Sequence, residues 1–486
     1  MEAKDGLAPA RLNTDHRRIS GREINVSELF DRLKGAVGAA GFVAGEDVGP
    51  RYFSDAAGHQ GARPSLVLRP ASTTEVSAIL ALCQATGQPL VPQGGMTGLV
   101  GAGLPAEGEV ALSLERLNAI EEIDSESGTM TVGAGAVLQT IQEAALAKGF
   151  SFPLDLGARG SCTIGGNLAT NAGGNRVIRY GVARELVLGL EAVLADGSVV
   201  GDLNKLIKNN TGYDLRQLFI GSEGTLGVIT RVTLRLYPKP ASQTVALCGL
   251  DDFAQVIRFL RHMQNAFSGG ISAFEVMWQS YFAEALKVTG RHSPFADPHP
   301  FYALTEVLGG SPERDQEAFE SALASAFDAG LINDAVVAKS LAEVNELWQL
   351  RDASSEVTRN LAPVLGYDVS IPVSRMVAFA EVLTASIDEL HPGNKTVIFG
   401  HVGDGNLHVT TTAGAADPEQ SKAVNCLVYK LTGANHGSIS AEHGIGIMKR
   451  PYLSYSRSDN DIALMRTLKA ALDPKGILSP GRIFEV

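Results

Sequence analysis

The sequence predicts an α+β protein with two large domains and a C-terminal segment. Short β-type runs separated by glycine turns dominate residues 110–240, and the 53 glycines concentrate there and in the preceding loop. After the YPKPA stretch that starts at Tyr237, apolar strands alternate with helices, which is typical of an antiparallel sheet with helices on one face. With 486 residues, the chain is long enough for two or three domains and a sizeable apolar core.

The first domain is expected to begin with a helix over residues 25–39. A strand at residues 65–70 precedes a second helix, which has Ser72 or Thr73 as its cap and Glu75 in its first turn. A strand at residues 89–95 completes a strand–helix–strand unit. Four β-type runs and a helix over residues 138–148 follow, up to Pro240.

The second domain is expected to start with the apolar strand TVALCGL. A helix over residues 252–266, two strands, a helix over residues 313–329 and another strand follow it. The resulting division predicts an N-terminal tail (1–24), a first domain (25–240), a second domain (241–449) and a C-terminal segment (450–486). The C-terminal segment is expected to be partly helical and to pack back on the first domain.

Composition excludes several classes of function. The net charge of −12 argues against a nucleic-acid partner, because phosphate binding needs a basic surface. The four cysteines lie far apart without a CxxC pair, which indicates reduced thiols rather than a cysteine zinc site. No apolar run approaches the roughly 20 residues of a membrane span, and the first 24 residues lack the apolar core of a leader peptide. We therefore expect a cytoplasmic protein without a transmembrane segment, and leave peripheral membrane docking and a homodimer open.

Three glycine-rich segments predict a cavity for a polar, phosphate-containing cofactor. In PQGGMTGLVGAG, which starts at Pro92, several backbone N–H groups can point at one anion, and glycine lets the backbone approach it closely. The segments at residues 155–181 and 218–230 are rich in small residues that hydrogen-bond. The run GAGAVL at Gly133 lacks the third glycine of the dinucleotide fingerprint, so no NAD-type Rossmann site is expected.

In this order, the three segments resemble the FAD-binding domain of the vanillyl-alcohol oxidase and p-cresol methylhydroxylase superfamily. The resemblance covers residues 25–240 and implies a two-subdomain FAD-binding domain of the p-cresol methylhydroxylase type. A noncovalent FAD is expected, because these loops contain no histidine and Cys162 is the only nearby candidate for a tether. By position, the implied FAD contacts are Pro92, Gly94, Gly95, Thr97, Gly98, Pro153, Gly157, Ser161, Thr163, Gly165, Gly166, Asn167, Thr170, Ala172, Gly173, Glu223, Gly224, Gly227 and Ile229.

A second candidate site lies near the end of the chain, where four of the ten histidines occur between residues 401 and 443. The runs TVIFGH, GDGN and LHVTTT predict a hairpin that brings His401 and His408 together. Two imidazoles and a carboxylate, best supplied by Glu442, make an open zinc-type site, which Mn²⁺ or Fe²⁺ would also accept. A zinc hydrolase is the alternative, but the HExxH helix motif is absent.

The motifs GHVGDGNLHVT, SAEHGIG and LDPKGILSPGR resemble the FAD-linked D-2-hydroxy-acid dehydrogenases. The stretches ELWQLRDASSEVT and YDVSIP are most similar to the D-2-hydroxyglutarate branch. The resemblance implies an antiparallel-sheet substrate or cap domain and oxidation of D-2-hydroxyglutarate to 2-oxoglutarate. D-lactate, D-malate and glycolate are alternative substrates. It also implies a separate electron acceptor, which is an electron-transfer flavoprotein, a quinone or a cytochrome.

The same resemblance assigns roles to residues of the second domain. His443 is expected to act as the base that removes the hydroxyl proton, while the hydride passes to the flavin. Arg351 is expected to bind a substrate carboxylate through its planar guanidinium. Ser355, Asn406 and Thr410 complete the predicted substrate contacts.

Two positions depart from the hydroxyglutarate pattern. Relatives in that branch carry a lysine just before the Tyr-Asp pair, where this chain has Gly366. They also tend to carry an asparagine where this chain has Thr410. The missing lysine removes one partner for a distal carboxylate, so the pocket uses another cation or prefers another acid. A non-redox flavin enzyme similar to the alkylglycerone-phosphate synthases and a catalytically silent subunit are the remaining alternatives.

Overall fold

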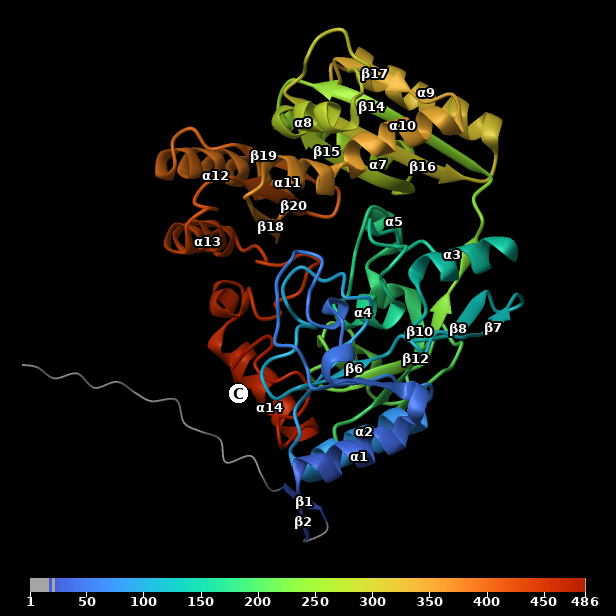
Figure 1. Ribbon diagram of the computed structural model, residues 1–486. Helices are drawn as coiled ribbons and strands as arrows, with labels where there is room; N and C mark the ends of the chain where they lie inside the picture. The colour runs from blue at the N-terminus through green and yellow to red at the C-terminus, as the bar shows by residue number, and fades with distance from the viewer. Residues whose placement is uncertain (1–16, 20–21, 486) are drawn as a thin grey trace, which may run out of the picture.

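The computed structural model describes residues 17–19 and 22–485, which form two lobes (Figure 1). The lower lobe contains the N-terminal half of the chain, and the upper lobe contains β14 to β20. Most of the predicted N-terminal tail lies outside the described residues. Its described parts, β1 (Arg17–Ile19) and β2 (Arg22–Ile24), pair as antiparallel strands.

One sheet of the lower lobe has four strands, and both neighbours of β6 in this sheet run parallel to β6. In spatial order the strands are β3 (Phe42–Ala44), β4 (Leu66–Leu68), β6 (Val110–Ser113) and β5 (Leu90–Gln93). Two helices accompany it, α1 (Val26–Val37) and α2 (Thr73–Thr86). Ser72 caps α2 by accepting the Glu75 N–H, and Gly87 ends the helix in the left-handed conformation.

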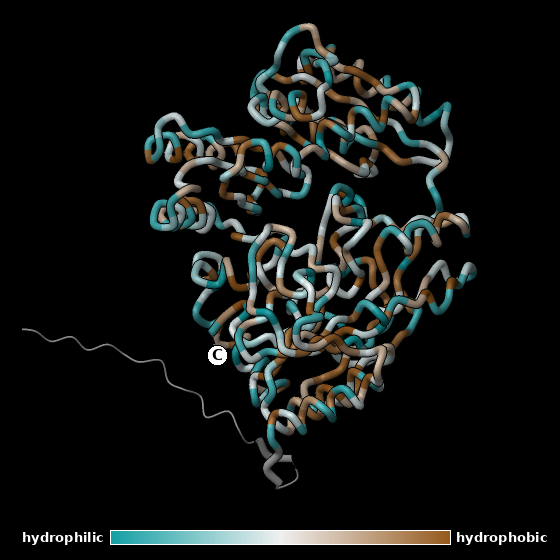
Figure 2. Tube along the Cα trace, in the orientation of Figure 1, coloured by the Kyte–Doolittle hydropathy of each residue, from teal (hydrophilic) through white to brown (hydrophobic). Residues whose placement is uncertain are grey.

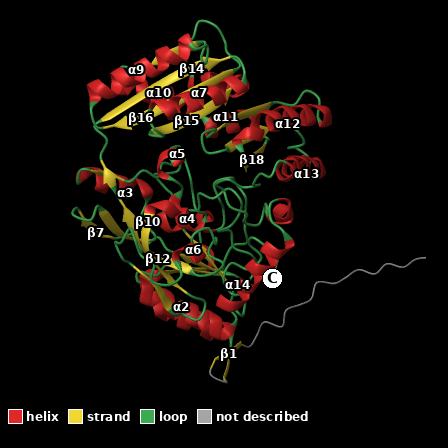
Figure 3. Cartoon of the chain, turned by 180° about the vertical axis from the view of Figure 1, so that it is seen from behind, coloured by secondary structure: helices red, strands yellow, loops and turns green. Residues whose placement is uncertain are grey.

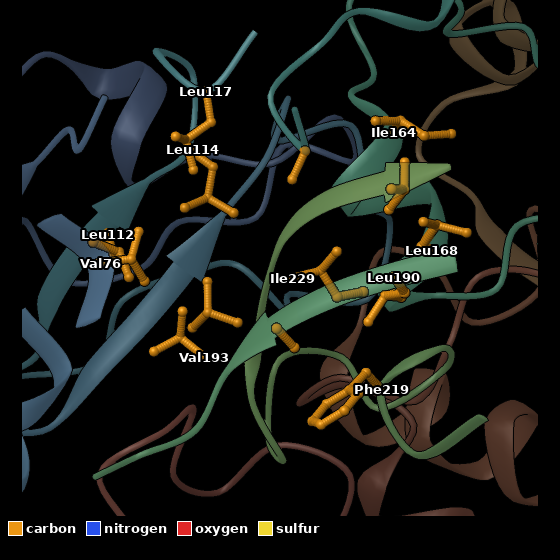
Figure 4. Close-up of a cluster of buried hydrophobic side chains, with 14 of the residues drawn as sticks. Val76, Leu112, Leu114, Leu117, Ile164, Leu168, Leu190, Val193, Phe219 and Ile229 are labelled. Atoms are coloured by element: carbon orange, nitrogen blue, oxygen red, sulfur yellow. The ribbon is translucent and has the colours of Figure 1, made fainter. Parts of the chain in front are cut away.

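The other sheet of the lower lobe is antiparallel. In spatial order its strands are β11 (Val199–Asp202), β10 (Val187–Val193), β12 (Val228–Arg235), β8 (Thr129–Gly133) and β7 (Ile120–Asp124). The remaining elements of this lobe are α3 (Leu138–Ala147), β9 (Phe150–Ser151), α4 (Ile164–Ala169), α5 (Val177–Tyr180), α6 (Arg216–Phe219) and β13 (Tyr237–Pro238). Figure 4 shows part of the apolar core that joins both sheets, in which Leu112 and Val193 belong to the same buried cluster.

The upper lobe contains one antiparallel sheet of seven strands. In spatial order they are β17 (Asp334–Val337), β14 (Ser242–Leu250), β16 (Phe301–Gly309), β15 (Ile271–Trp278), β19 (Thr396–Gly400), β20 (Asn406–Thr411) and β18 (Leu365–Ser370). One face shares a core with α7 (Phe253–Ala266), α9 (Pro312–Asp328), α12 (Met376–Leu390) and α13 (Pro418–Ala434). The other face packs against α8 (Gln279–Thr289), α10 (Leu341–Asp352) and α11 (Ser354–Leu361).

Helices therefore cover both faces of this sheet, and the prediction of helices on one face is wrong. The strands explain the difference, because β15 is buried along nearly its whole length instead of alternating between buried and exposed residues. Figure 2 shows the apolar residues following the strands, with hydrophilic residues on the outer helices and loops.

The C-terminal segment contains a short 3₁₀ helix (Arg450–Tyr455) and α14 (Asp459–Leu472), and lies against the lower lobe (Figure 1). Leu478 pairs with Leu90, and the Lys469 ammonium donates to the Thr225 carbonyl at 2.9 Å. Arg482 forms a buried ion pair with Glu109. The domain boundaries given above stay a prediction. No helix among the described residues is long and apolar enough to cross a membrane.

The two lobes are joined by α5, which reaches from the lower lobe to the upper sheet (Figure 3). Arg176, just before α5, donates through Nε to the buried Glu306 of β16 at 3.0 Å and also binds Asp155 of the lower lobe. Ile178 of α5 lies against Gly403 in the turn between β19 and β20. These contacts fix the glycine-rich segment at residues 155–181 relative to the hairpin of His401 and His408.

Candidate active site

A cavity of about 320 Å³ lies where the three glycine segments of the lower lobe meet. All predicted FAD contacts except Pro153 and Ser161 lie on its walls. Pro153 is buried, and the Ser161 carbonyl packs against Gly95. Glu442 and His443, which lie more than 200 residues further along the chain, complete the wall.

The glycines of the cavity are required by close backbone contacts. A Cβ on Gly95 would lie 2.1 Å from the Ser161 carbonyl oxygen, and one on Gly94 would lie 2.5 Å from Thr163 Oγ1. A Cβ on Gly173 would meet Glu442 Oε1 at 2.4 Å. The three segments therefore interlock without side chains at these positions, which leaves backbone groups to face a ligand.

Polar groups in the cavity fit a bound FAD. Thr163 Oγ1 is buried and has no hydrogen-bond partner within the described part of the chain, so a ligand atom can satisfy it. Burial raises the pKa of the Cys162 thiol, whose sulfur accepts a hydrogen bond from Asn167 Nδ2 at 3.6 Å. A neutral, buried thiol is a poor nucleophile for a covalent flavin link.

The upper sheet brings the predicted metal ligands together. His401 follows β19 and His408 lies in β20, so the turn between these paired strands places the two rings 5.3 Å apart. Glu442 Oε2 lies 3.9 Å from Nε2 of each histidine. The other oxygen, Oε1, accepts the N–H of Gly174. One ligand atom from each of the three residues lies within 4.8 Å of the others, which fits a two-histidine, one-carboxylate metal site.

Glu275 of β15 orients the first of these histidines. His401 Nδ1 donates to Glu275 Oε1 at 2.7 Å, which leaves Nε2 directed toward Glu442. Burial alone would lower the pKa of His401, but the neighbouring Glu275 carboxylate outweighs it and raises this pKa to about 9. Burial alone would raise the pKa of Glu275, but the positive charges of Arg351 and His401 outweigh it and lower this pKa to about 2. Sequence reasoning missed Glu275, although one acidic residue inside the apolar run ISAFEVMW was an available signal.

Asp368 of β18 was also missed, and it holds the loop that carries Glu442 and His443. Its Oδ2 accepts the backbone N–H of both residues at 2.9 Å. Its Oδ1 accepts Asn406 Nδ2 at 2.8 Å. Despite complete burial, the nearby His443 and Lys449 keep the pKa of Asp368 well below its usual range. Asp368 is therefore a carboxylate that supports the site from behind.

Glu223 supports the same loop from the flavin side. It was predicted as an FAD contact and lies on the cavity wall, with a φ of 51°. Each of its carboxylate oxygens accepts one backbone N–H, from Ile445 and from Gly446, both at 2.7 Å. The loop at residues 441–446 is thus held by one carboxylate from each lobe.

His443 is suited to accept a proton. Burial, with a contribution from the Lys449 ammonium, lowers its pKa, so the imidazole is neutral near pH 7. Its Nδ1 lies 3.7 Å from Asp368 Oδ2, and the ring lines the flavin cavity. Burial also lowers the pKa of His408 well below its ordinary value, which leaves a lone pair for a metal.

Three of the four predicted substrate contacts are buried near the histidine cluster or on the same strand, and the fourth is exposed on a helix. Arg351 is buried, donates from Nε to Glu275 at 2.8 Å and places Nη2 3.1 Å from His401 Nε2. Asn406 is buried, and its Oδ1 has no partner among the described residues, which makes it available to a ligand. Thr410 is buried one pleat further along β20, whereas Ser355 is exposed on α11.

Two family models match most of the chain. The model described as FAD binding domain matches residues 64–201, and the model described as FAD linked oxidases, C-terminal domain matches residues 239–483. A mitochondrial D-2-hydroxyglutarate dehydrogenase of Bos taurus is 43% identical over 85% of this chain and 76% of its own length. A putative mitochondrial D-lactate dehydrogenase of Schizosaccharomyces pombe is 38% identical over 86% of this chain and 81% of its own length.

A solved structure of p-cresol methylhydroxylase with bound substrate has the same fold. It superposes with a TM-score of 0.75 over 94% of this chain and 97% of that chain, at 16% identity. The likeness confirms the predicted fold class, an FAD-binding domain of this type followed by a C-terminal domain.

The prediction of a cytoplasmic protein is wrong. The relatives from Bos taurus and Schizosaccharomyces pombe are both named as mitochondrial proteins. The prediction depended on the absence of recognisable leader features within the first 24 residues, and such an absence is a weak physical signal for location.

Proposed function

This chain belongs to the FAD-linked D-2-hydroxy-acid dehydrogenases, and from that premise we propose that it oxidises D-2-hydroxyglutarate to 2-oxoglutarate with noncovalent FAD and a divalent metal ion. The observation that carries the proposal is the position of the loop at Glu442 and His443. One side of this loop lines the flavin cavity, and the other side completes the histidine cluster. A substrate held at the cluster therefore lies next to the flavin.

His401, His408 and Glu442 are proposed to hold the metal, with zinc preferred and Mn²⁺ or Fe²⁺ as alternatives. When bound, the metal supplies a Lewis acid that lowers the pKa of the substrate hydroxyl. The chain prepares the site in two ways: Glu275 orients His401, and the Gly174 N–H fixes Glu442. Such supporting contacts hold the ligand atoms in one geometry.

His443 is proposed to take the proton from the 2-hydroxyl. Its neutral imidazole lies at the boundary between cavity and cluster, where the hydroxyl and the hydrogen on carbon 2 must both be positioned. Bound FAD supplies the acceptor for the hydride that leaves carbon 2. The unpaired Asn406 Oδ1 is proposed to accept a substrate or flavin N–H or O–H group. Arg351 is proposed to bind the carboxylate next to the hydroxyl.

The reduced flavin must then pass its electrons to a separate acceptor, and we propose an electron-transfer flavoprotein, a quinone or a cytochrome for this role.

The direct test of the proposed function does not need this acceptor. The FAD-loaded protein is mixed anaerobically with D-2-hydroxyglutarate, D-malate, D-lactate and glycolate in turn, while the flavin absorbance is recorded. We expect fast bleaching with D-2-hydroxyglutarate. A flavin that no acid reduces would overturn the proposal and favour non-redox chemistry.

D-lactate is the second candidate substrate. Gly366 and Thr410, where the hydroxyglutarate pattern has Lys and Asn, are direct cross-strand partners, so no cation projects from this pair. A putative D-lactate dehydrogenase is also among the relatives. Faster bleaching with D-lactate than with D-2-hydroxyglutarate would establish this second function.

A further inference from the structure

Arg176 bridges one carboxylate of each lobe at the point where α5 reaches the upper sheet (Figure 3). Its Nε and Nη2 donate to the two oxygens of Glu306 in β16, at 3.0 and 3.3 Å. Its Nη1 donates to Oδ2 of Asp155 in the lower lobe at 2.5 Å. One planar guanidinium therefore holds the two lobes together through three charged hydrogen bonds.

The upper end of this bridge is anchored inside the sheet. The Glu306 side chain is fully buried, and its oxygens also accept Ser272 Oγ at 2.9 Å and Gln243 Nε2 at 2.7 Å. Ser272 belongs to β15, the strand that also carries Glu275, the support of the histidine cluster. A buried carboxylate with several partners has little freedom to move, so Glu306 gives the bridge a fixed point within the sheet that holds the cluster.

The lower end of the bridge packs against the turn at residues 173–176. Asp155 pairs with Gly174 as a parallel β-bridge, and the Asp155 carbonyl accepts the Asn175 N–H at 3.3 Å. A Cβ on Gly174 would lie 2.0 Å from that carbonyl oxygen, so the contact leaves no room for a side chain. The turn and Asp155 must therefore move together.

The same turn touches both halves of the candidate site. Gly173 lies on the wall of the flavin cavity. The Gly174 N–H donates to Oε1 of Glu442, the proposed third metal ligand. A shift of this turn relative to the upper sheet would therefore displace the cavity wall and the carboxylate at once. Arg176 opposes such a shift, because it ties the turn to Glu306.

We propose that Arg176 is a positioning residue that sets the spacing between the flavin cavity and the histidine cluster. Hydride transfer depends steeply on such spacing, since a misplacement of about 1 Å can cost about a hundredfold in rate. Arg176 acts through the turn at residues 173–176 and needs no contact with the substrate. A lysine would keep the charge but not the planar fork that spans two carboxylates. This inference rests on the proposed function and extends it to a residue that joins the lobes.

The test measures anaerobic flavin reduction of the FAD-loaded protein by stopped flow, with D-2-hydroxyglutarate and with its carbon-2-deuterated form. In Arg176→Gln the limiting rate should fall about 10- to 100-fold, with little change in the substrate concentration that gives half of it. Deuterium should slow the variant at least as much as the wild type, because hydride transfer is the impaired step. FAD and metal content should equal those of the wild type, because no ligand group is removed. Arg176→Lys should show an intermediate loss.

Arg159→Gln is the matched control. Arg159 is exposed and pairs with the same Asp155 at 3.1 Å, but both residues belong to the lower lobe. This variant should reduce its flavin at the wild-type rate, because the bridge between the lobes stays intact. An equal loss of rate in Arg159→Gln and Arg176→Gln would contradict the bridging role.

A double variant separates positioning from stability. Arg176→Gln leaves Glu306 buried without its cation, so the melting temperature should fall. Adding Glu306→Gln removes the buried charge and should restore much of the melting temperature, whereas flavin reduction should stay slow. Recovery of both properties in the double variant would show a purely structural role and overturn the inference.

Hydrogen exchange supplies a readout that does not depend on turnover. Amides of the turn at residues 173–176 should exchange faster in Arg176→Gln and in the double variant than in the wild type, because the turn is no longer tied to the upper sheet. Wild-type exchange of this turn or wild-type flavin reduction in Arg176→Gln would overturn the inference. A wild-type flavin that no hydroxy acid reduces would overturn the proposed function and the inference with it.

Discussion

Two walls of the candidate site differ in what holds them together. The flavin wall is formed by the three glycine-rich segments of the lower lobe, and the proposed hydroxy-acid wall is formed by the histidine cluster of the upper sheet and the acidic residues that support it. On the flavin side, Gly95 and Gly173 bring backbone groups so close together that a Cβ would collide at 2.1 and 2.4 Å. On the hydroxy-acid side, charged side chains of a rigid sheet hold one another, as Glu275 holds His401 at 2.7 Å. The first wall depends on the shape of the backbone, and the second depends on pairs of ionised groups.

Because the two walls are held together differently, mutations in one wall should affect a different property from mutations in the other. A substitution that adds volume to the flavin wall should reduce FAD binding while the proposed metal ligands stay in place. A substitution that neutralises a charge on the sheet should reduce metal binding or turnover while FAD stays bound. Measuring FAD content, metal content and turnover on each variant therefore tests whether the two walls are independent.

The largest effect is expected from the proposed base. His443→Ala should lower kcat about 10²- to 10⁴-fold, because proton removal in the transition state then lacks its acceptor. FAD should remain bound, as judged from the visible spectrum of the purified protein. Normal turnover in this variant would exclude the assigned base, and loss of FAD would show that the two walls are not separable at this residue.

A glycine variant should show the opposite pattern. Gly95→Ala places a methyl group against the Ser161 carbonyl, so overpacking by about 1–3 kcal/mol should weaken FAD binding by about ten- to hundredfold. Metal content should not change. Gly49→Ala is the control, because a Cβ there meets no atom within 4 Å. Full FAD content in Gly95→Ala after dialysis would contradict the close contact.

Glu275→Gln tests whether Glu275 holds His401, one of the proposed metal ligands, in position. Loss of the carboxylate that orients His401 should weaken metal binding by about ten- to hundredfold, as measured by competition with a chelator. The flavin spectrum should be that of the wild type. The exposed Glu317 of α9 provides a control as Glu317→Gln. Unchanged metal affinity would mean that Glu275 serves only to pair with Arg351.

Glu223→Gln probes the point where the two walls meet. Glutamine offers one acceptor oxygen where the carboxylate offers two, so either Ile445 or Gly446 loses its partner. We expect about a tenfold loss of kcat with FAD retained, because one buried N–H group is left unsatisfied. The exposed Glu126 supplies the control as Glu126→Gln. If FAD is lost instead, Glu223 contacts the flavin directly.

The flavin wall could be predicted from sequence because its determinants are local. Runs of glycine and small polar residues within the three segments already indicate backbone that approaches a ligand, and nearly all of these positions line the cavity. The hairpin of His401 and His408 could be predicted for the same reason, since a short turn joins its two strands. Glu442 was expected as the third ligand from the residue types alone, and the structure brings it beside residues 401 and 408 although no local pattern joins the two segments.

The supports of the hydroxy-acid wall could not be predicted because their partners are distant in sequence. Glu275 contacts His401 across 126 residues, and Asp368 contacts Glu442 across 74. Only the strand pairing shows that Gly366 and Thr410 are neighbours. Without the order of strands in the sheet, these residues are single charges or small residues within apolar runs.

The most direct test of the account is the rate of flavin reduction by D-2-hydroxyglutarate before and after removal of the metal. The metal is stripped with a chelator, its loss is verified by elemental analysis, and reduction is followed anaerobically by stopped-flow absorbance. We predict that stripping abolishes fast bleaching while FAD stays bound, and that one equivalent of zinc or manganese restores it. Full-rate reduction in the verified metal-free protein would contradict the claim that the histidine cluster positions the hydroxy acid at the flavin.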